Sequence, residues 1–401
     1  MEFDVMIIGG GLAGLTAGLA LQEKGKRTAI VSAGQNALHF SSGAFGLLDR
    51  EDPFGAVAEL DEDHPYARIG ADSLRTFAEK AKGLFARAGI ELNGNPLGNG
   101  FRLTPQGALK RAWLTLPEVD LFPDEAAVKG HKVLIVNLLG YLDFNTSFLA
   151  LGLEKKGCTC RVETLRLPEM ERLRQNPSEM RSVNIARVMD NAWVKVAGEV
   201  KSLLKDEDWV ILPQVFGLRD ATVPSQIRET VPARVLFVGT MPPSVPGMRT
   251  QMQLKRAYEA LGGTFLMGDE VLSAETEGAR VRSVETRNIG RIGAGNFLLA
   301  TGSYFSKGIA SDMNHVYEPL FRADVIQDEG RGSWYDPNFF NPQSFLSYGV
   351  ATTPGFKVLK DGVPFENLYA AGSVLGGCRS LALGCGAGVA LVTALSVAET
   401  I

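Results

Sequence analysis

The sequence predicts an α/β protein in which a Rossmann-like domain, with a parallel sheet and a β-meander, is interrupted by a smaller α/β domain. An apolar run followed by a glycine motif opens the chain, strand and helix patterns alternate through its middle, and glycine-rich strand ends recur near residues 300 and 372. We expect the first domain to combine residues 1–61 with 241–401, and the inserted domain to span residues 62–240.

The composition is that of an ordinary folded protein. The chain has 401 residues, of which 45% are hydrophobic and 21% charged, and its formal net charge is −4. These values exclude a disordered chain, and the mildly acidic balance argues against a protein that grips nucleic acid phosphates. The 45 glycines exceed the usual share of roughly 7%, which indicates close approach of backbone to a ligand or to other backbone.

The cysteines and the long uncharged stretches have unremarkable interpretations. Cys158, Cys160, Cys378 and Cys385 contain no C-x-x-C pair, so the sequence predicts free thiols and neither a zinc site nor an iron–sulfur cluster. Residues 5–22 and 380–398 are uncharged but contain turn signals. We expect both stretches to be buried strand–loop–helix segments and not membrane spans.

A βαβ unit opens the chain. Residues 3–8 are an apolar run typical of a central parallel strand, residues 9–14 fit G-x-G-x-x-G, and a helical segment then leads to a second strand at 27–31. Gly9 permits the tight turn, Gly11 lets backbone amides approach a phosphate, and Gly14 lets the helix pack on the strand. The motif in this context predicts a nucleotide site at the helix N-terminus.

One expected residue is missing from this unit. A dinucleotide site normally has Asp or Glu near the end of the second strand, where it binds the adenosine ribose. Here the chain reads Ser32-Ala33-Gly34-Gln35-Asn36. Either Ser32 or Asn36 binds the ribose more weakly, or the ligand is a mononucleotide without adenosine.

Three further segments favour a flavin over a nicotinamide. Residues 37–43 place small hydroxylated side chains after the second strand, residues 297–303 are an apolar strand ending in A-T-G, and residues 366–373 are a strand ending in A-G-S. A glycine-rich loop then leads into a helix whose N-terminus is suited to the flavin N1–C2=O edge. The residues that we predict to bind the cofactor, beyond the three glycines of the motif, are Ser32, Ser41, Ser42, Gly43, Ala300, Thr301, Gly302, Gly372, Ser373 and Gly386.

The middle of the chain has its own α/β pattern. Apolar, β-branched runs predict strands at residues 132–137, 160–165, 209–212 and 234–238, and apolar periodicity predicts helices at 146–155 and 182–201. These segments are expected to form a cap or partner-facing domain with a small parallel sheet. Beyond them we expect an amphipathic helix at 248–261 and a β-meander at 271–299.

The residues for the chemical step are not identified by any motif. His39 is the candidate with the best sequence position, because it follows the second strand in the predicted flavin-facing loop. Arg187 and Arg249 are candidates for holding a phosphate or carboxylate, because a guanidinium matches those anions. No metal cluster or Ser-His-Asp arrangement is predicted.

The segments together resemble the B subunit of anaerobic glycerol-3-phosphate dehydrogenase, a family within the glutathione-reductase-like FAD-dependent oxidoreductases. The resemblance covers essentially the whole chain. It rests on GGGLAGL at 9–15, ALHFSSG at 37–43, SVNIAR at 182–187, PPSV at 242–245, GDEV at 268–271, NLYAAGSVLGG at 367–377 and GCGAGV at 384–389.

This resemblance implies a cytoplasmic flavoprotein component, peripheral to the cell membrane, of a three-subunit enzyme. The family oxidises sn-glycerol 3-phosphate to dihydroxyacetone phosphate and delivers electrons to quinone in anaerobic respiration. The implied partners are an FAD-bearing catalytic A subunit and an iron–sulfur, membrane-anchoring C subunit, with FMN in the B subunit. FMN agrees with the missing ribose carboxylate, whereas the two-phosphate fingerprint keeps FAD as the alternative.

Two other functions remain open at this stage. A free-standing FAD-dependent oxidoreductase of the fumarate-reductase type would react with its substrate without a partner. A non-redox scaffold would keep the flavoprotein fold empty. The chain also carries no basic surface signature of the kind that a flavin-dependent RNA-modifying enzyme needs.

Overall fold

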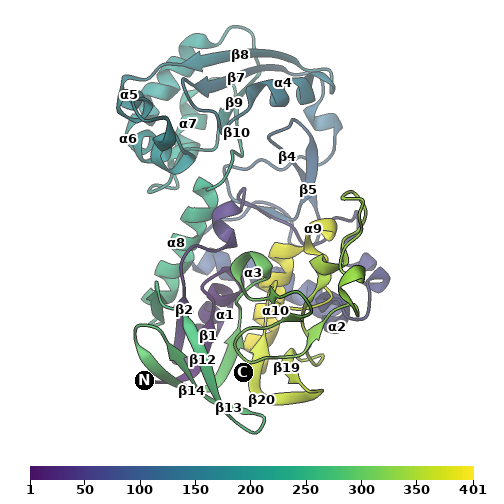
Figure 1. Cartoon of the computed structure of the whole chain (residues 1–401). Helices are drawn as coiled ribbons and strands as arrows, with labels where there is room; N and C mark the ends of the chain where they lie inside the picture. Colours follow the sequence, from purple (N-terminus) through teal and green to yellow (C-terminus); the bar gives the residue numbers. More distant parts are fainter.

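The computed structural model describes residues 1–401, which fold into two units that lie one above the other in Figure 1. Each unit has its own hydrophobic core, with 66 buried residues in the lower unit and 36 in the upper one. Both chain termini lie in the lower unit. The chain therefore leaves the lower unit, builds the upper one and returns, as the α/β fold class with an insertion requires.

The lower unit is built on an eight-stranded sheet around β1 (Glu2–Ile8). β1 pairs in parallel with β2 (Thr28–Ser32) and with β14 (Gly290–Leu299). β11 (Thr264–Met267) extends the sheet in parallel beyond β2, and β20 (Val363–Ala370) pairs in parallel with the end of β14. Because these strands run in one direction, their carboxyl ends meet at the same edge of the sheet.

The predicted meander is confirmed. β12 (Val271–Glu277), β13 (Arg280–Thr286) and β14 are antiparallel neighbours at the far side of the sheet, and β19 (Lys357–Lys360) pairs antiparallel with β20. The first half of β14 pairs with β13, and its second half pairs with β20. β14 therefore joins the meander to the parallel strands.

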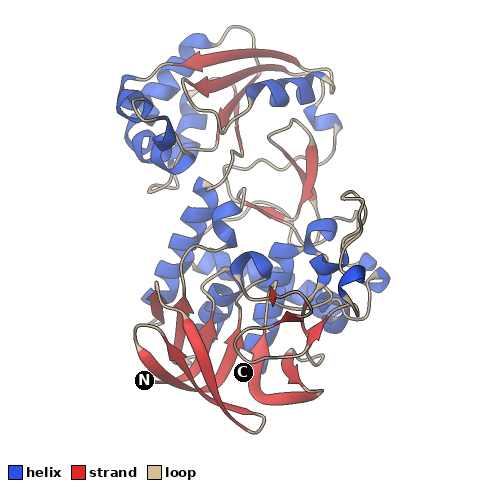
Figure 2. Cartoon of the chain, viewed as in Figure 1, coloured by secondary structure: helices blue, strands red, loops and turns tan.

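Helices cover the sheet on the side that faces the upper unit (Figure 2). α1 (Leu12–Glu23) begins two residues after the turn at Gly10 and packs beside α10 (Gly386–Thr400) and α8 (Val245–Ala260). α3 (Ala71–Arg87) packs against α10. The helices α1 and α10 are apolar nearly all round, as expected for helices enclosed on every side.

The two uncharged stretches are parts of these buried segments, as predicted. Residues 5–22 comprise most of β1, the glycine turn and most of α1, and residues 380–398 comprise α9 (Ser380–Leu383), a turn and most of α10. The structure contains no helix that combines the length and the apolar character needed to traverse a bilayer.

The upper unit contains the predicted small parallel sheet. Its strand order is β10 (Arg234–Val238), β9 (Trp209–Pro213), β7 (Lys132–Leu138) and β8 (Thr159–Leu165), with every neighbouring pair parallel. The helices that pack around it are α4 (Thr146–Glu154), α5 (Glu171–Arg174), α6 (Ser182–Leu203) and α7 (Val223–Thr230). The predicted strands and helices of this region are confirmed within three residues at their ends.

The segment between the units belongs partly to the lower core. α3 lies within residues 62–240, yet its buried side chains belong to the lower cluster, as do Trp113, Leu114 and Leu116. The upper cluster draws its side chains from Leu103 onward. Packing therefore divides the chain later than residue 62, because the apolar face of α3 is covered by α10.

Short elements complete the chain. They are α2 (Pro65–Ile69) and the two-stranded pairs β3 (Ala44–Phe45) with β6 (Leu114–Thr115), β4 (Gly100–Leu103) with β5 (Leu109–Ala112), β15 (Ala310–Ser311) with β16 (Val316–Tyr317), and β17 (Val325–Ile326) with β18 (Gly349–Val350).

Candidate cofactor site

A cavity of about 1390 Å³ opens where β1, β2 and β14 end. Ligands of open α/β sheets bind at this edge, and the volume exceeds the roughly 300–1,000 Å³ that is typical of small-molecule pockets. The cavity therefore has room for an extended ligand. The predicted cofactor residues on its wall are Gly9, Gly11, Ser32, Ser41, Ala300, Thr301, Gly302, Ser373 and Gly386.

The glycine motif forms the turn between β1 and α1. Gly9 has φ +119°, and a Cβ there would lie 2.2 Å from the carbonyl oxygen of Ala300. A Cβ on Gly14 would lie 1.9 Å from the carbonyl oxygen of Gly9, so only glycine lets α1 approach β1 this closely. Gly11 faces the cavity at the start of α1, where unpaired helix N–H groups favour an anion.

The side chains after β2 support this turn. Asn36 donates from Nδ2 to the carbonyl oxygen of Gly10 at 2.9 Å and accepts from the N–H of Leu38 at 3.0 Å. The Ser32 hydroxyl donates to the carbonyl oxygen of Gly34 at 3.3 Å. The segment therefore contributes hydroxyl and amide groups to the cavity, and no carboxylate.

A carboxylate reaches this end of the cavity from a segment that the sequence analysis did not select. Asp269 follows β11, the strand beside β2, and the N–H of Gly268 donates to the carbonyl oxygen of Ser32 at 2.8 Å. Burial alone raises the pKa of Asp269, but hydrogen bonds from the N–H groups of Asn288 and Glu270 outweigh it and lower that pKa. Its Oδ2 atom is buried and has no hydrogen-bond partner, and the residue lines the cavity, which suits a ligand hydroxyl.

The A-T-G segment forms the opposite wall. The N–H of Ala300 donates to the carbonyl oxygen of Ile8 at 2.8 Å, which places the segment beside the glycine turn. Thr301 lines the cavity, and its hydroxyl is buried without a hydrogen-bond partner. Unpaired buried polar atoms at Thr301 and Asp269, together with the glycine cradle, fit a polar ligand that carries a phosphate.

α10 completes the wall with its first turn. Gly386, Ala387 and Ala390 line the cavity, so the helix N-terminus points toward it. The first N–H groups of a helix have no intrahelical partner and carry partial positive charge. A ligand that gains negative charge on reduction is stabilised at this position.

Comparison with known proteins assigns the family. The FAD binding domain model matches residues 4–389. The chain is 40% identical to the B subunit of anaerobic glycerol-3-phosphate dehydrogenase from Yersinia enterocolitica, covering 100% of this chain and 98% of that protein. It is 39% identical to the protein of the same name from Glaesserella parasuis, covering 100% and 99%. The chain belongs to the B-subunit family of anaerobic glycerol-3-phosphate dehydrogenase.

Solved structures of low similarity include two oxidoreductases that match along the whole chain. Glycine oxidase from Bacillus cereus is 14% identical with a TM-score of 0.36, covering 99% of this chain and 96% of that chain. L-proline dehydrogenase from P. horikoshii is 13% identical with a TM-score of 0.36, covering 99% and 92%.

In this member of the B-subunit family, four predicted cofactor residues lie behind the cavity wall. Gly14 packs α1 on β1, and the N–H of Gly372 donates to the Thr393 hydroxyl of α10 at 2.9 Å. Gly43 has φ +79°, and its Cβ position is crowded by Pro246; Ser42 is likewise outside the wall. The three glycines shape the site through packing.

The three candidates for chemistry do not line the cavity of this B-subunit family member. The His39 ring is buried and its Nε2 is hydrogen-bonded to Gln251 of α8. Arg249 is buried in an ion pair with Glu118 and donates to the carbonyl oxygen of Gly217 at 2.6 Å. Arg187 is exposed on α6 and contacts Asn184. The three side chains are turned toward α8, the Glu118 loop and solvent, respectively.

Aromatic side chains border the cavity on its outer side. Phe40 and Phe305 both line it, are half or more exposed, and meet edge to face with ring centroids 4.9 Å apart. Tyr304 lies beside Phe305, and burial raises the pKa of its hydroxyl to about 12. These three side chains therefore form an uncharged, aromatic part of the cavity border at physiological pH.

Proposed function

We propose that this chain binds a flavin in the cavity and acts as the B subunit of an anaerobic glycerol-3-phosphate dehydrogenase, which oxidises sn-glycerol 3-phosphate to dihydroxyacetone phosphate. The proposal rests on one observation. The glycine turn, the Thr301 segment and the α10 N-terminus surround a single cavity, in a chain that is 40% identical over its full length to a relative of that name. A bound flavin supplies two-electron redox chemistry there.

In this proposal each part of the cavity wall has a separate function. The N–H groups at Gly11 and the start of α1 bind the phosphate, and the Thr301 hydroxyl binds a polar edge of the ligand. The N-terminus of α10 stabilises negative charge on the reduced cofactor. The Phe40–Phe305 rim excludes water.

We propose FAD as the flavin, although the missing carboxylate after β2 and the resemblance favoured FMN. The support is the continuation of the cavity past the glycine turn to Asp269, Val271 and Leu272, with the unpartnered Oδ2 of Asp269 available for a ribose hydroxyl. Asp269 thus takes the place of the carboxylate that the sequence lacks near Ser32. The matching family model is also an FAD binding domain.

We further propose that the chain relays electrons and does not itself bind glycerol 3-phosphate. The basic residues on the cavity wall are Arg287, which pairs with Glu270 at 2.6 Å, and the exposed Lys307. A phosphate dianion is held best by charge-assisted bonds from several donors, and Arg249 is already paired with Glu118. The FAD-bearing catalytic partner would oxidise the substrate. Electrons would leave toward quinone through the iron–sulfur partner, which would hold this chain at the cytoplasmic face of the membrane.

The cofactor is tested by releasing it from the purified chain and determining its mass. We expect FAD, with Asp269→Asn retaining less of it than the wild type. Glu270→Gln is the matched control, because this neighbour also lines the cavity but is paired with Arg287. FMN in the wild type, or equal retention by both variants, would contradict the assignment of FAD.

The relay is tested by adding sn-glycerol 3-phosphate to the flavin-loaded chain under anaerobic conditions. We expect the flavin absorbance to bleach only when the FAD-bearing catalytic partner is present. Bleaching by the chain alone would favour the free-standing oxidoreductase. The scaffold alternative predicts colourless protein whose Gly11→Asp variant still supports the complex. Gly198→Asp, on the exposed face of α6 with open space around it, is the control for that variant.

A further inference from the structure

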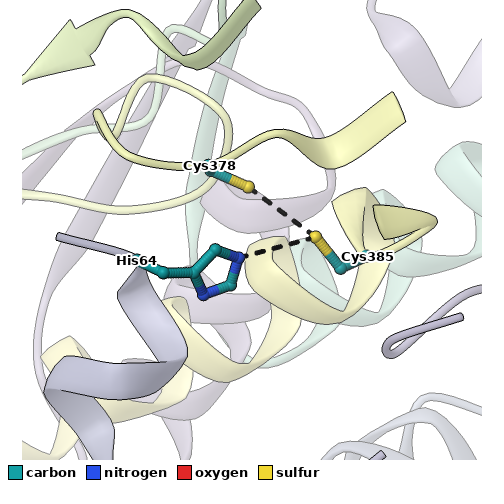
Figure 3. A group of neighbouring side chains, drawn as sticks. All are labelled: His64, Cys378 and Cys385. Atoms are coloured by element: carbon teal, nitrogen blue, oxygen red, sulfur yellow. Dashed lines mark hydrogen bonds between the residues drawn. The ribbon is translucent and has the colours of Figure 1, made fainter. Parts of the chain in front are cut away.

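Three chemically reactive side chains meet behind the cavity wall, and the proposed function does not use them. They are His64 at the start of α2, Cys378 in the loop after β20, and Cys385 at the start of α10 (Figure 3). All three are buried, at 1%, 6% and 0% exposure. Their ligand atoms lie within 4.8 Å of one another.

The sulfur atoms are close enough to interact directly. The Sγ atoms of Cys378 and Cys385 are 3.8 Å apart, and Nε2 of His64 lies 3.8 Å from Sγ of Cys385. Figure 3 shows both contacts as dashed lines that meet at the sulfur atom of Cys385. Cys385 is therefore the shared partner of a thiol and an imidazole.

The hydrogen bond at the other ring nitrogen of His64 indicates whether the cluster is suited to a metal. Nδ1 accepts a hydrogen bond from the N–H of Tyr66 at 3.1 Å, so Nδ1 carries no proton and Nε2 does. A histidine that binds a metal through Nε2 normally donates its Nδ1–H to another group. Here Nδ1 faces a donor, so the geometry disfavours a metal and makes His64 a hydrogen-bond donor to Cys385.

The surroundings shift the pKa values of the two thiols in opposite directions. Hydrogen bonds from Cys378 and His64 lower the pKa of Cys385 to about 6, and the same contact together with burial raises the pKa of Cys378. Cys385 also lies at the N-terminus of α10, where the helix favours a thiolate. One thiolate beside one protonated thiol is the arrangement from which a disulfide forms.

We propose that Cys378 and Cys385 form a redox-active dithiol–disulfide pair that exchanges two electrons with the flavin of this cavity. In the oxidising direction the Cys378 S–H bond breaks and the S–S bond forms. The two electrons and the Cys378 proton pass to the oxidised flavin, giving its singly protonated reduced anion. The total charge and the number of hydrogen atoms are the same on both sides. His64 keeps its Nε2 proton and acts as a positioning residue.

The flavin is the redox partner because the sulfur atoms are closed off from solvent and adjoin the cavity wall. Ser380 and Gly386, which flank Cys385 in the fold, both line the cavity, and the N–H of Cys385 donates to the carbonyl oxygen of Ser380 at 3.3 Å. A soluble disulfide or peroxide has no comparable access. This inference rests on flavin binding and adds a second two-electron store to it.

Anaerobic reductive titration of the flavin-loaded chain with dithionite tests the pair. We expect the wild type to take up one electron pair more per flavin than Cys378→Ser or Cys385→Ser. Cys158→Ser is the matched control, because Cys158 is a buried thiol of the upper unit and should leave the uptake unchanged. Mass analysis of the oxidised, denatured and alkylated wild type should show Cys378 and Cys385 joined.

The outcomes separate this inference from the proposed function. Equal electron uptake by the wild type and Cys378→Ser, with flavin retained by both, would contradict the redox-active pair and leave flavin binding intact. A stoichiometric metal in the wild type that is lost in Cys385→Ser would also overturn it. Colourless wild-type protein would overturn flavin binding and the pair together. His64→Gln should keep the extra electron pair but raise the pH at which the reduction potential of the pair, measured in equilibrium with the flavin, changes its slope with pH, since a merely structural histidine would not move that profile.

Discussion

The two units of the molecule contain parallel sheets of similar construction, yet only the lower sheet has the large cavity at its strand ends. There the chain continues from the strands with Gly9, Gly11, Ala300 and Ala371, whose small size leaves the edge open. In the upper unit β7 is followed by the buried Tyr141 and Phe144, and β9 by the buried Phe216. Parallel strands therefore place a possible ligand site at their carboxyl ends, and a cavity forms there only where the residues that follow the strands are small.

The largest expected effect on stability comes from breaking the buried ion pair that connects the two units. Arg249 of α8 and Glu118 are both nearly fully buried, and Arg249 also bonds Gly217 beside the upper sheet. Removing one partner leaves the other charge buried and unpaired, so Arg249→Met should lower the free energy of unfolding by roughly 3–5 kcal/mol. Urea unfolding measures this loss.

Arg187→Met is the matched control for that substitution. Arg187 is exposed and its partner is the Asn184 side chain, so we expect a change within about 0.5 kcal/mol. Equal losses in the two variants would show that the Glu118 pair does not hold the units together.

The next largest effect on stability is expected when one glycine of each unit is replaced by alanine. A Cβ on Gly14 would lie 1.9 Å from backbone oxygen, whereas nothing lies within 4 Å of the Cβ position of Gly198 on α6. Gly14→Ala should destabilise the chain by about 1–3 kcal/mol and release the flavin, because α1 must move away from β1. Gly198→Ala should stabilise it by roughly 0.5–1 kcal/mol. Thermal unfolding and flavin absorbance report both outcomes, and a flavin-loaded, fully stable Gly14→Ala protein would refute the close-packing argument.

The same contrast explains which features the sequence could predict. The glycine turn and the strands of both sheets were predictable, because each depends on a short run of neighbours: apolar residues 3–8 before Gly9, or β-branched residues 132–137. α3 was missed although Leu74, Phe77, Ala78 and Ala81 have helical spacing and are buried. The apolar spacing of a helix was therefore present in the sequence. The segment was assigned to the inserted domain only because it lies between residues 62 and 240.

The contacts between distant segments could not be predicted from local patterns. Asp269 reaches the cavity only because the short strand β11 pairs with β2, more than 230 residues earlier in the chain. Cys385 and His64 are 321 residues apart in the sequence, and Arg249 and Glu118 are 131 apart. A single sequence shows the residue types at these positions and does not show their partners. The free thiols were predictable, but their contact with His64 and the pairing of Arg249 with Glu118 were not.

The smallest effect is confined to the upper unit and depends on pH. Glu207 is nearly buried, and a hydrogen bond from Arg161 lowers its pKa from 4.5 to about 2. Because the folded-state pKa is depressed, the pair stabilises the unit fully above pH 4.5 and loses this contribution as the pH falls through about 2. Glu207→Gln should therefore destabilise the unit by about 1 kcal/mol at pH 7, with solvent screening at Arg161 considered, and by much less at pH 2. Hydrogen exchange should accelerate in β7–β10 and stay unchanged around the flavin cavity, with Glu163→Gln, at the more exposed partner of Arg161, as the control. An equal acceleration in the lower unit would mean that the two cores do not respond separately.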